Sequence, residues 1–317
     1  MKKHCISIVI SVYNEEKGIF AFWKLLTKSL NQDHSICYEL LWVNDGSTDN
    51  TQIFIDKITS ENSSPLINFV VIEFSKNFGH ESAMIAGIDN ATGDAVICMD
   101  SDGQHPPKEI HKMINAFLKG NEVVLMKRID RKDSGLIKKS FSRLFYKIIN
   151  FLSVIKFEKN STDFFLVSKR VAKVLKKNYR DQNRFIRGFV QSVGFSKTII
   201  TFSAPARLQG ESNYSYWKLL KLAFSAIFSF SNKPLRISIG ISILFILLTL
   251  ALCGYTLYMY IYGSMVPSGY TTIIIFLSAS FSTLFIALSV LSLYFEKLIK
   301  EVHKRPIYII KRKQKVE

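Results

Sequence analysis

The amino-acid sequence predicts an α/β protein with a mostly parallel sheet, followed by amphipathic helices at a membrane surface and two transmembrane helices. Over about the first 125 residues, short apolar runs alternate with longer mixed segments, as in βαβ units. Polar residues directly follow four of these runs. From Ile237 to Phe295 the chain has no charged residue and no histidine, and one membrane span needs roughly 20 apolar residues.

The candidate strands are rich in Val and Ile and apolar on both faces, as in a parallel sheet that helices cover. They are Ile6–Ser11, Leu40–Asn44, Phe69–Phe74, Ala95–Met99 and Val123–Met126. Helices are expected between them, over about Glu16–Leu30, Thr48–Thr59, His80–Ala91 and Pro107–Leu118. Ligands of such sheets bind beyond the carboxyl ends of the strands, so the functional site is expected there.

Asp100 and Asp102 follow the fourth predicted strand and are the strongest chemical signal at this edge. Two carboxylates flanking one residue can hold a hard divalent cation such as Mg²⁺ or Mn²⁺, and the ion would neutralise a leaving diphosphate. A solvated acidic turn is the alternative. The sequence has no GxGxxG after the first strand and no GxxxxGK[ST], which disfavours a dinucleotide-binding dehydrogenase and a P-loop NTPase.

Eight segments in a fixed order carry a family resemblance. They are Val9–Glu16, Val43–Asp49, Asn77–His80, Asp100–Gln104, Ser161–Leu166, Arg184–Gly188, Arg207–Tyr214 and Glu301–Tyr308. Together they resemble the family 2 glycosyltransferases of the GT-A fold. Within these, the chain looks like the polyprenyl-phosphate glycosyltransferases of the bactoprenol glucosyltransferase type, which are related to dolichol-phosphate mannose synthases.

The resemblance implies a nucleotide-sugar pocket in which the second residue of Asn44-Asp45 hydrogen-bonds a uracil. The residues expected around the donor are Tyr13, Asn14, Glu15, Asp45, Lys76, Asp100 and Gln104. The alternative for Tyr13, Asn14 and Glu15 is that they form a turn or a helix cap, and Asn44-Asp45-Gly46-Ser47 alone would be only a turn. Lys76 either contacts a donor phosphate or is solvated.

The resemblance also implies an inverting single displacement with Asp163 as general base and Asp102 acting through the metal ion. A helix N-cap is the other interpretation of Ser161-Thr162-Asp163. Arg128, Arg143 and Arg207 fall where relatives bind the acceptor phosphate, a task that suits the planar guanidinium fork. Phe165 stands where relatives usually carry Arg, so either another cation takes that role or the acceptor phosphate is held differently.

The predicted domain order is a GT-A domain over 1–213, including an amphipathic helix at about 139–157, then a juxtamembrane amphipathic helix at 214–234. Spans at 235–262 and 270–295 enclose an external loop, 263–269, and a basic cytoplasmic tail follows at 296–317. Basic residues flank the spans, so the positive-inside rule places the catalytic domain and both termini in the cytoplasm. The resemblance implies that the membrane is a bacterial inner membrane. A buried helical hairpin is the alternative.

The sequence therefore predicts transfer of a hexose, from UDP-glucose in the first instance, to undecaprenyl phosphate for modification of a surface glycan. A processive polysaccharide synthase is the second hypothesis, although no QxxRW sequence is present. A non-catalytic basic membrane adaptor is the third. The formal net charge of +17 surrounds membrane segments, which favours anionic lipids over nucleic acid. By family analogy, the protein is expected to be a homo-oligomer, a tetramer.

Overall fold

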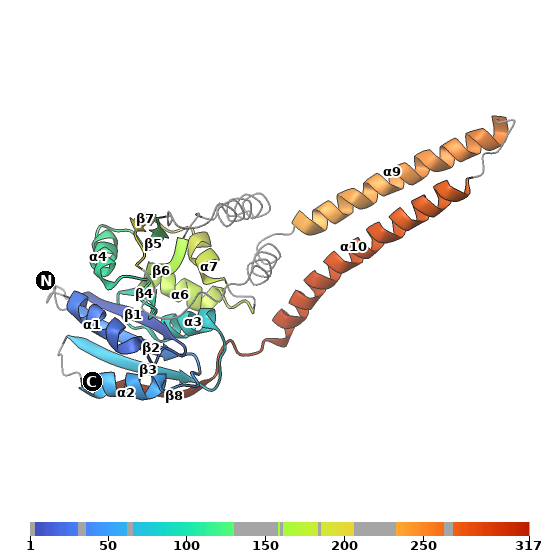
Figure 1. Ribbon diagram of the computed structural model, residues 1–317. Helices are drawn as coiled ribbons and strands as arrows, with labels where there is room; N and C mark the ends of the chain where they lie inside the picture. The colour runs from blue at the N-terminus through green and yellow to red at the C-terminus, as the bar shows by residue number, and fades with distance from the viewer. Residues whose placement is uncertain are drawn as a thin grey trace. The chain divides into compact units, whose positions relative to one another are not determined.

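Figure 1 shows the computed structural model of the protein, which divides into two compact units. The first comprises Met1–Tyr146, Phe157–Ser215 and Arg305–Glu317, and the second comprises Lys147–Lys156 and Tyr216–Lys304. The structure describes residues 4–30, 36–61, 66–129, 158, 161–182, 185–205, 233–262 and 269–316.

In its described part, the first unit contains an eight-stranded sheet with the order β7-β5-β6-β4-β1-β2-β3-β8. The strands are β1 (His4–Val12), β2 (Ile36–Asn44), β3 (Ile67–Phe74), β4 (Ala95–Asp100), β5 (Val123–Arg128), β6 (Ser161–Ser168), β7 (Lys197–Phe202) and β8 (Ile310–Val316). The pairs β1–β2, β1–β4, β2–β3 and β5–β7 are parallel, whereas β6 and β8 pair antiparallel with their neighbours. The sheet is thus mostly parallel, as predicted.

Helices cover both faces of the sheet (Figure 1). One face carries α1 (Ile19–Leu30), α2 (Thr51–Glu61) and α4 (Ile110–Leu118), whose apolar side chains share a core with alternate residues of the strands. The other face carries α3 (His80–Asn90), α6 (Lys169–Asn178) and α7 (Ile186–Ser192). A short 3-10 turn, η1 (Pro107–Glu109), leads into α4.

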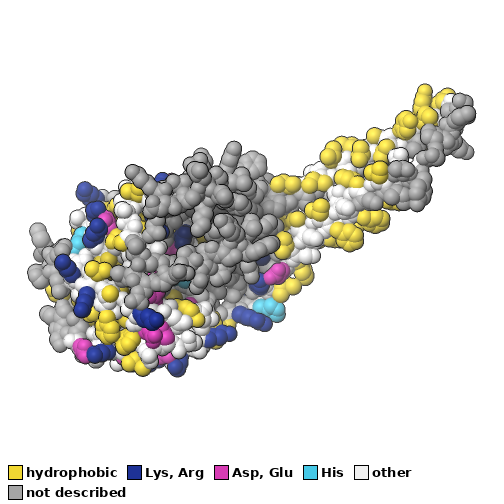
Figure 2. Space-filling model, viewed as in Figure 1, with side chains coloured by type: hydrophobic (Ala, Val, Ile, Leu, Met, Phe, Trp, Pro, Cys, Tyr) yellow, Lys and Arg dark blue, Asp and Glu magenta, His cyan; other side chains and the backbone are white. Residues whose placement is uncertain are grey.

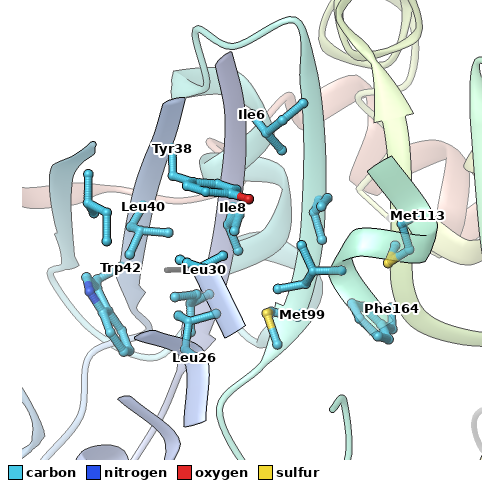
Figure 3. Close-up of a cluster of buried hydrophobic side chains, with 14 of the residues drawn as sticks. Ile6, Ile8, Leu26, Leu30, Tyr38, Leu40, Trp42, Met99, Met113 and Phe164 are labelled. Atoms are coloured by element: carbon cyan, nitrogen blue, oxygen red, sulfur yellow. The ribbon is translucent and has the colours of Figure 1, made fainter. Parts of the chain in front are cut away.

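The core fixes the sheet and the start of α3 relative to each other. Figure 3 shows Ile8, Leu40 and Trp42 on the strands meeting Leu26 of α1, and all four side chains are fully buried. On the opposite face, a Cβ added to Gly87 of α3 would lie 2.1 Å from Val9 Cγ1. Only glycine permits this approach, so α3 lies directly against β1 and its first residues reach the carboxyl edge of the sheet.

The five predicted strands are confirmed, and each extends further than predicted. The helix predicted from Glu16 begins at Ile19, and β6, β7 and β8 were not predicted. The prediction of a basic tail over 296–317 is wrong. The helix α10 (Tyr270–His303) continues past the predicted end of the second span, and β8 then joins the sheet beside β3.

The basic residues of β8 are engaged in this docking. Lys311 Nζ lies 2.5 Å from Glu73 Oε1, and Arg312 Nη1 lies 2.8 Å from Asp56 Oδ2. Just before the strand, the Tyr308 hydroxyl donates a 2.7 Å hydrogen bond to Asp89. Exposed lysines on an edge strand also oppose pairing with further chains.

The described part of the second unit consists of α9 (Lys233–Tyr262) and α10. Both are long and apolar enough to cross a membrane, over Ile239–Met259 and Ile275–His303. Figure 2 shows hydrophobic side chains along both helices, and Leu244 is 64% exposed. The predicted amphipathic helix at 139–157, and most of the predicted segments 214–234 and 263–269, lie outside the described residues.

Candidate active site

The carboxyl ends of the parallel strands meet at one edge of the sheet, as predicted. Ser11 of β1 and Asp100 of β4 are partners in the strand register. A cavity of about 300 Å³ opens at this edge. Its lining includes Ser11, Tyr13, Asp45, His80, Asp100 and Asp102.

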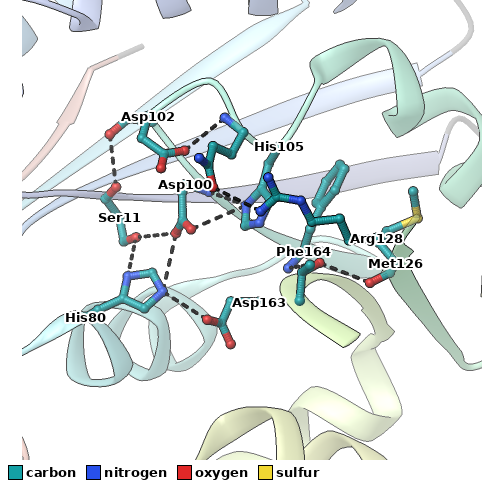
Figure 4. Close-up of polar contacts among 12 residues, drawn as sticks. Ser11, His80, Asp100, Asp102, His105, Met126, Arg128, Asp163 and Phe164 are labelled. Atoms are coloured by element: carbon teal, nitrogen blue, oxygen red, sulfur yellow. Dashed lines mark hydrogen bonds and ion pairs between the residues drawn. The ribbon is translucent and has the colours of Figure 1, made fainter. Parts of the chain in front are cut away.

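Asp100 lies at the centre of the polar contacts in Figure 4. Its Oδ1 accepts a 3.2 Å hydrogen bond from Ser11 Oγ and lies 3.3 Å from His80 Nε2. Its backbone N–H donates to His105 Nδ1 at 2.9 Å. These contacts fix the carboxylate at the end of β4, facing the cavity.

His105 is a neutral support for this turn. Its Nδ1 accepts the Asp100 N–H, so the same nitrogen cannot donate to Asp100 Oδ2, which lies 3.5 Å away. Burial lowers the pKa of His105, in agreement with a neutral ring. The ring stacks on Phe164 with 5.1 Å between the centroids. His105 therefore ties the acidic turn to β6.

Asp102, Gln104 and Arg128, three predicted site residues, form a chain of contacts on one side of the cavity. Asp102 Oδ1 accepts the Gln104 N–H at 2.9 Å, and Arg128 Nη1 lies 3.3 Å from Gln104 Oε1. The structure thus brings Arg128 beside the acidic turn. Arg143 and Arg207, the other predicted phosphate ligands, lie outside the described residues.

Asp163 lies within β6, so the helix N-cap interpretation is wrong. Asp163 is 5% exposed, and both of its carboxylate oxygens accept from the guanidinium fork of Arg187. Burial alone would raise the pKa of Asp163, but the charge and hydrogen bonds of Arg187 hold it well below its usual range. Phe165, at the position where the family resemblance led us to expect Arg, is buried in the core. Arg187 brings the cation to Asp163 instead.

His80 lies between Asp100 and Asp163 (Figure 4). Its Nε2 is 3.3 Å from Asp100 Oδ1 and 3.6 Å from Asp163 Oδ2, and its Nδ1 is 2.9 Å from Ser11 Oγ. Burial lowers the pKa of His80, but the charges of Asp100 and Asp163 outweigh burial and raise it to about 10. In the described structure His80 lines the cavity, whereas Asp163 lies behind it.

Asp45 joins the cavity wall to the start of α3. The residue is 3% exposed, and its carboxylate accepts the backbone N–H groups of Phe78, at 2.7 Å, and Gly79, at 2.9 Å. The adjacent Gly46 has φ of +65° and packs against the backbone of Lys76, a conformation and a contact that favour glycine.

The other residues predicted around the donor lie at or near the rim. Tyr13 is 45% exposed, and Glu15 also lines the cavity. The Asn14 side chain accepts the Thr48 N–H at 2.9 Å, so Asn14 supports the loop. Lys76 is exposed above the Phe78 ring and is not among the cavity-lining residues that the structure describes.

The sequence predicts no role for His80, Glu81 or Arg187. His80 and Glu81 belong to the segment and the helix that follow the third strand, and Arg187 belongs to one of the segments that carry the family resemblance. The signal available for His80 was its place at a strand end. No comparable signal marks Arg187, because its partner Asp163 is 24 residues away on another element.

Two comparisons with known proteins, one with family models and one with individual relatives, give the same family. The family model described as "Glycosyl transferase family 2" matches residues 7–176, which include Asp45, Asp100, Asp102 and Asp163. The chain belongs to glycosyltransferase family 2. It is accordingly a glycosyltransferase, and its mostly parallel α/β sheet is of the GT-A type.

Among family 2 relatives, the prophage bactoprenol glucosyl transferase homolog of Escherichia coli K12 is 35% identical over 98% of this chain and 99% of its own length. The bactoprenol glucosyl transferase of Shigella phage SfII is 35% identical over 97% of each chain. A crystal structure of glucosyl-3-phosphoglycerate synthase from Mycobacterium tuberculosis with Mn²⁺, UDP-glucose and phosphoglyceric acid matches with a TM-score of 0.46. It is 18% identical, over 71% of this chain and 78% of that chain.

Proposed function

We propose that this family 2 glycosyltransferase moves a hexose, glucose in the first instance, from a UDP-sugar to a polyprenyl phosphate at a bacterial inner membrane. The observation that carries the proposal is the full-length similarity to proteins named bactoprenol glucosyl transferases, which extends beyond the catalytic unit through both apolar helices. The acidic cavity at the sheet edge supports it, because it offers oxygen ligands beside a nucleotide-sized space.

A divalent cation, Mg²⁺ or Mn²⁺, fits the acidic turn. Asp100 and Asp102 both line the cavity, and carboxylate oxygens are the ligands that these ions prefer. Among the described residues, no group of three or more His, Cys, Asp or Glu side chains is placed to hold an ion by itself. Donor phosphates and water would therefore complete the coordination. The bound ion would neutralise charge on the leaving diphosphate.

In the proposed reaction, an oxygen of the acceptor phosphate attacks the anomeric carbon while the bond from that carbon to the nucleoside diphosphate breaks. The acceptor phosphate is already an anion, so the step needs little base catalysis. Asp163, held ionised by Arg187, would orient the attacking group through its neighbours. The two apolar helices would hold the catalytic unit near the lipid, with both chain ends in the cytoplasm.

Asp45→Asn is expected to raise the donor KM about tenfold, because a uracil N–H would lose a charged acceptor. An amide oxygen can still accept one of the two backbone N–H bonds at the start of α3. Titration of UDP into the purified variant would measure the loss of affinity directly. Glu61→Gln, on the exposed end of α2, is the control and should bind UDP as the wild type does. Unchanged UDP affinity in Asp45→Asn would remove Asp45 from the pocket.

The proposed function is tested by incubating lipid-reconstituted protein with undecaprenyl phosphate, Mg²⁺ or Mn²⁺ and a panel of labelled nucleotide sugars. Label in the organic phase from one donor, lost with a chelator, is the expected result and identifies the sugar. Label in long water-soluble chains would indicate a processive synthase instead. Absence of both products and of nucleotide binding would favour a non-catalytic adaptor.

A further inference from the structure

The orientation of Arg187 depends on a short helix. Arg187 is the second residue of α7, a helix of seven residues. The same guanidinium that binds Asp163 also donates to the carbonyl oxygen of Ser161 through Nη1, at 3.3 Å. Arg187 can meet β6 in this way only if the first turn of α7 is held in place.

The first turn of α7 has no cap from its own segment. The N-cap residue, Phe185, makes no side-chain hydrogen bond to the helix, although the first N–H groups of any helix lack partners within it. The Ile186 N–H instead donates to Glu81 Oε2 at 2.8 Å. The acceptor is 105 residues away in the chain, on the first turn of α3.

Glu81 is itself held in place from the other side. It follows His80 in α3, and the backbone just before it is fixed by the two hydrogen bonds from Phe78 and Gly79 to Asp45. A continuous series of contacts therefore runs from the wall of the donor cavity to Asp163. Within this series Glu81 is the residue of α3 that contacts α7, through the Ile186 N–H.

We propose that Glu81 is a positioning residue for sugar transfer, whose carboxyl group fixes the start of α7 so that the Arg187 fork holds Asp163 behind His80. The inference rests on the proposed function, in which Asp163 serves the transfer step. Glu81 is not among the described residues that line the cavity, so no direct contact with the donor is part of the proposed role. Loss of the Glu81 carboxyl group should therefore lower kcat and leave the donor KM nearly unchanged.

The acceptor atom of Glu81, rather than its charge, is the essential feature. Burial and the charge of Asp163 raise the pKa of Glu81 to about 7, so the group carries a proton part of the time near neutral pH. A carboxyl oxygen accepts the Ile186 N–H in either state. Glu81→Gln keeps such an oxygen, whereas Glu81→Ala removes it.

The test measures kcat, donor KM and UDP affinity in the lipid-reconstituted full-length chain. Glu81→Ala should lower kcat about tenfold and leave donor KM and UDP affinity within about twofold, while Glu81→Gln should restore most of kcat. The exposed Glu61→Ala is the matched control and should behave as the wild type does. Wild-type kcat in Glu81→Ala, or an equal loss in Glu81→Gln, would overturn the inference.

A second readout does not depend on activity. Hydrogen–deuterium exchange over Ile186–Ser192 should be faster in Glu81→Ala and unchanged in Glu81→Gln, and unchanged exchange in both would also overturn the inference. If Glu81→Ala does not fold, Glu81→Met replaces it, because methionine has a similar length but no oxygen to accept the Ile186 N–H. Lack of transfer by the wild type would count against the proposed function, and the exchange measurement would still decide whether Glu81 fixes the start of α7.

Discussion

Replacing Asp102 with Asn is expected to lower the rate of sugar transfer by about a thousandfold, because a metal ion bound at the acidic turn would lose an anionic ligand. The substitution is nearly isosteric. The Asn oxygen can still accept the Gln104 N–H that Asp102 accepts at 2.9 Å, so the turn should survive and only the charge is lost. The loss should therefore appear in kcat with little change in thermal stability.

The measurement is initial rate of label transfer against Mg²⁺ or Mn²⁺ concentration, with wild-type protein and chelator as references. Asp102→Asn should need far more metal to reach its residual rate. Thermal unfolding of both proteins, followed by circular dichroism, serves as the folding control. A variant that keeps more than a third of the wild-type rate at saturating metal would exclude Asp102 from the metal site.

Asp163→Asn is expected to lower kcat about a hundredfold and to destabilise the catalytic unit. The change leaves Arg187 beside a neutral amide, which loses the paired charge at a site where Asp163 is 5% exposed. Because the Arg187 side chain is 37% exposed, the cost in unfolding free energy should be about 2 kcal/mol, below that of a fully buried pair. Chemical denaturation and steady-state rates measure the two effects separately.

A second substitution separates chemistry from stability. In Asp163→Asn with Arg187→Gln, no charge is left unpaired, so most of the lost stability should return. The transfer rate should stay low, because the negative charge behind His80 is still missing. Recovery of the rate together with the stability would mean that Asp163 only holds the fold.

The parts of the fold that depend on local sequence pattern were predictable. Runs such as Ala95–Met99 are apolar on both faces, and such runs form covered parallel strands. Polar residues after these runs marked Asp45, Asp100 and Asp102, which the structure brings to one cavity. Parallel strands place their carboxyl ends together, so this juxtaposition follows from topology alone.

The parts that depend on distant partners were not predictable. The strand β8 has the sequence IKRKQKV, whose four basic residues leave no alternation of apolar and polar residues that would predict a strand. Its extended conformation is stabilised by pairing with β3. The hydrogen bond from Ile186 to Glu81 joins two helices through side-chain geometry, which no spacing in the sequence encodes. For the same reason, the sequence does not predict that Arg187 is the cation that pairs with Asp163.

Because the chain returns to the sheet after α10, the segment between β7 and β8 can cross a membrane only an even number of times. Strand β7 ends at Phe202 and strand β8 begins at Ile310, yet both belong to one sheet. A chain that departs from one side of a bilayer and rejoins the same sheet must cross an even number of times. If α9 crosses a membrane, α10 must cross it back. In that case the pairing of β3 with β8 would place the C-terminus on the same side of the membrane as the sheet, independently of the charges that flank the helices.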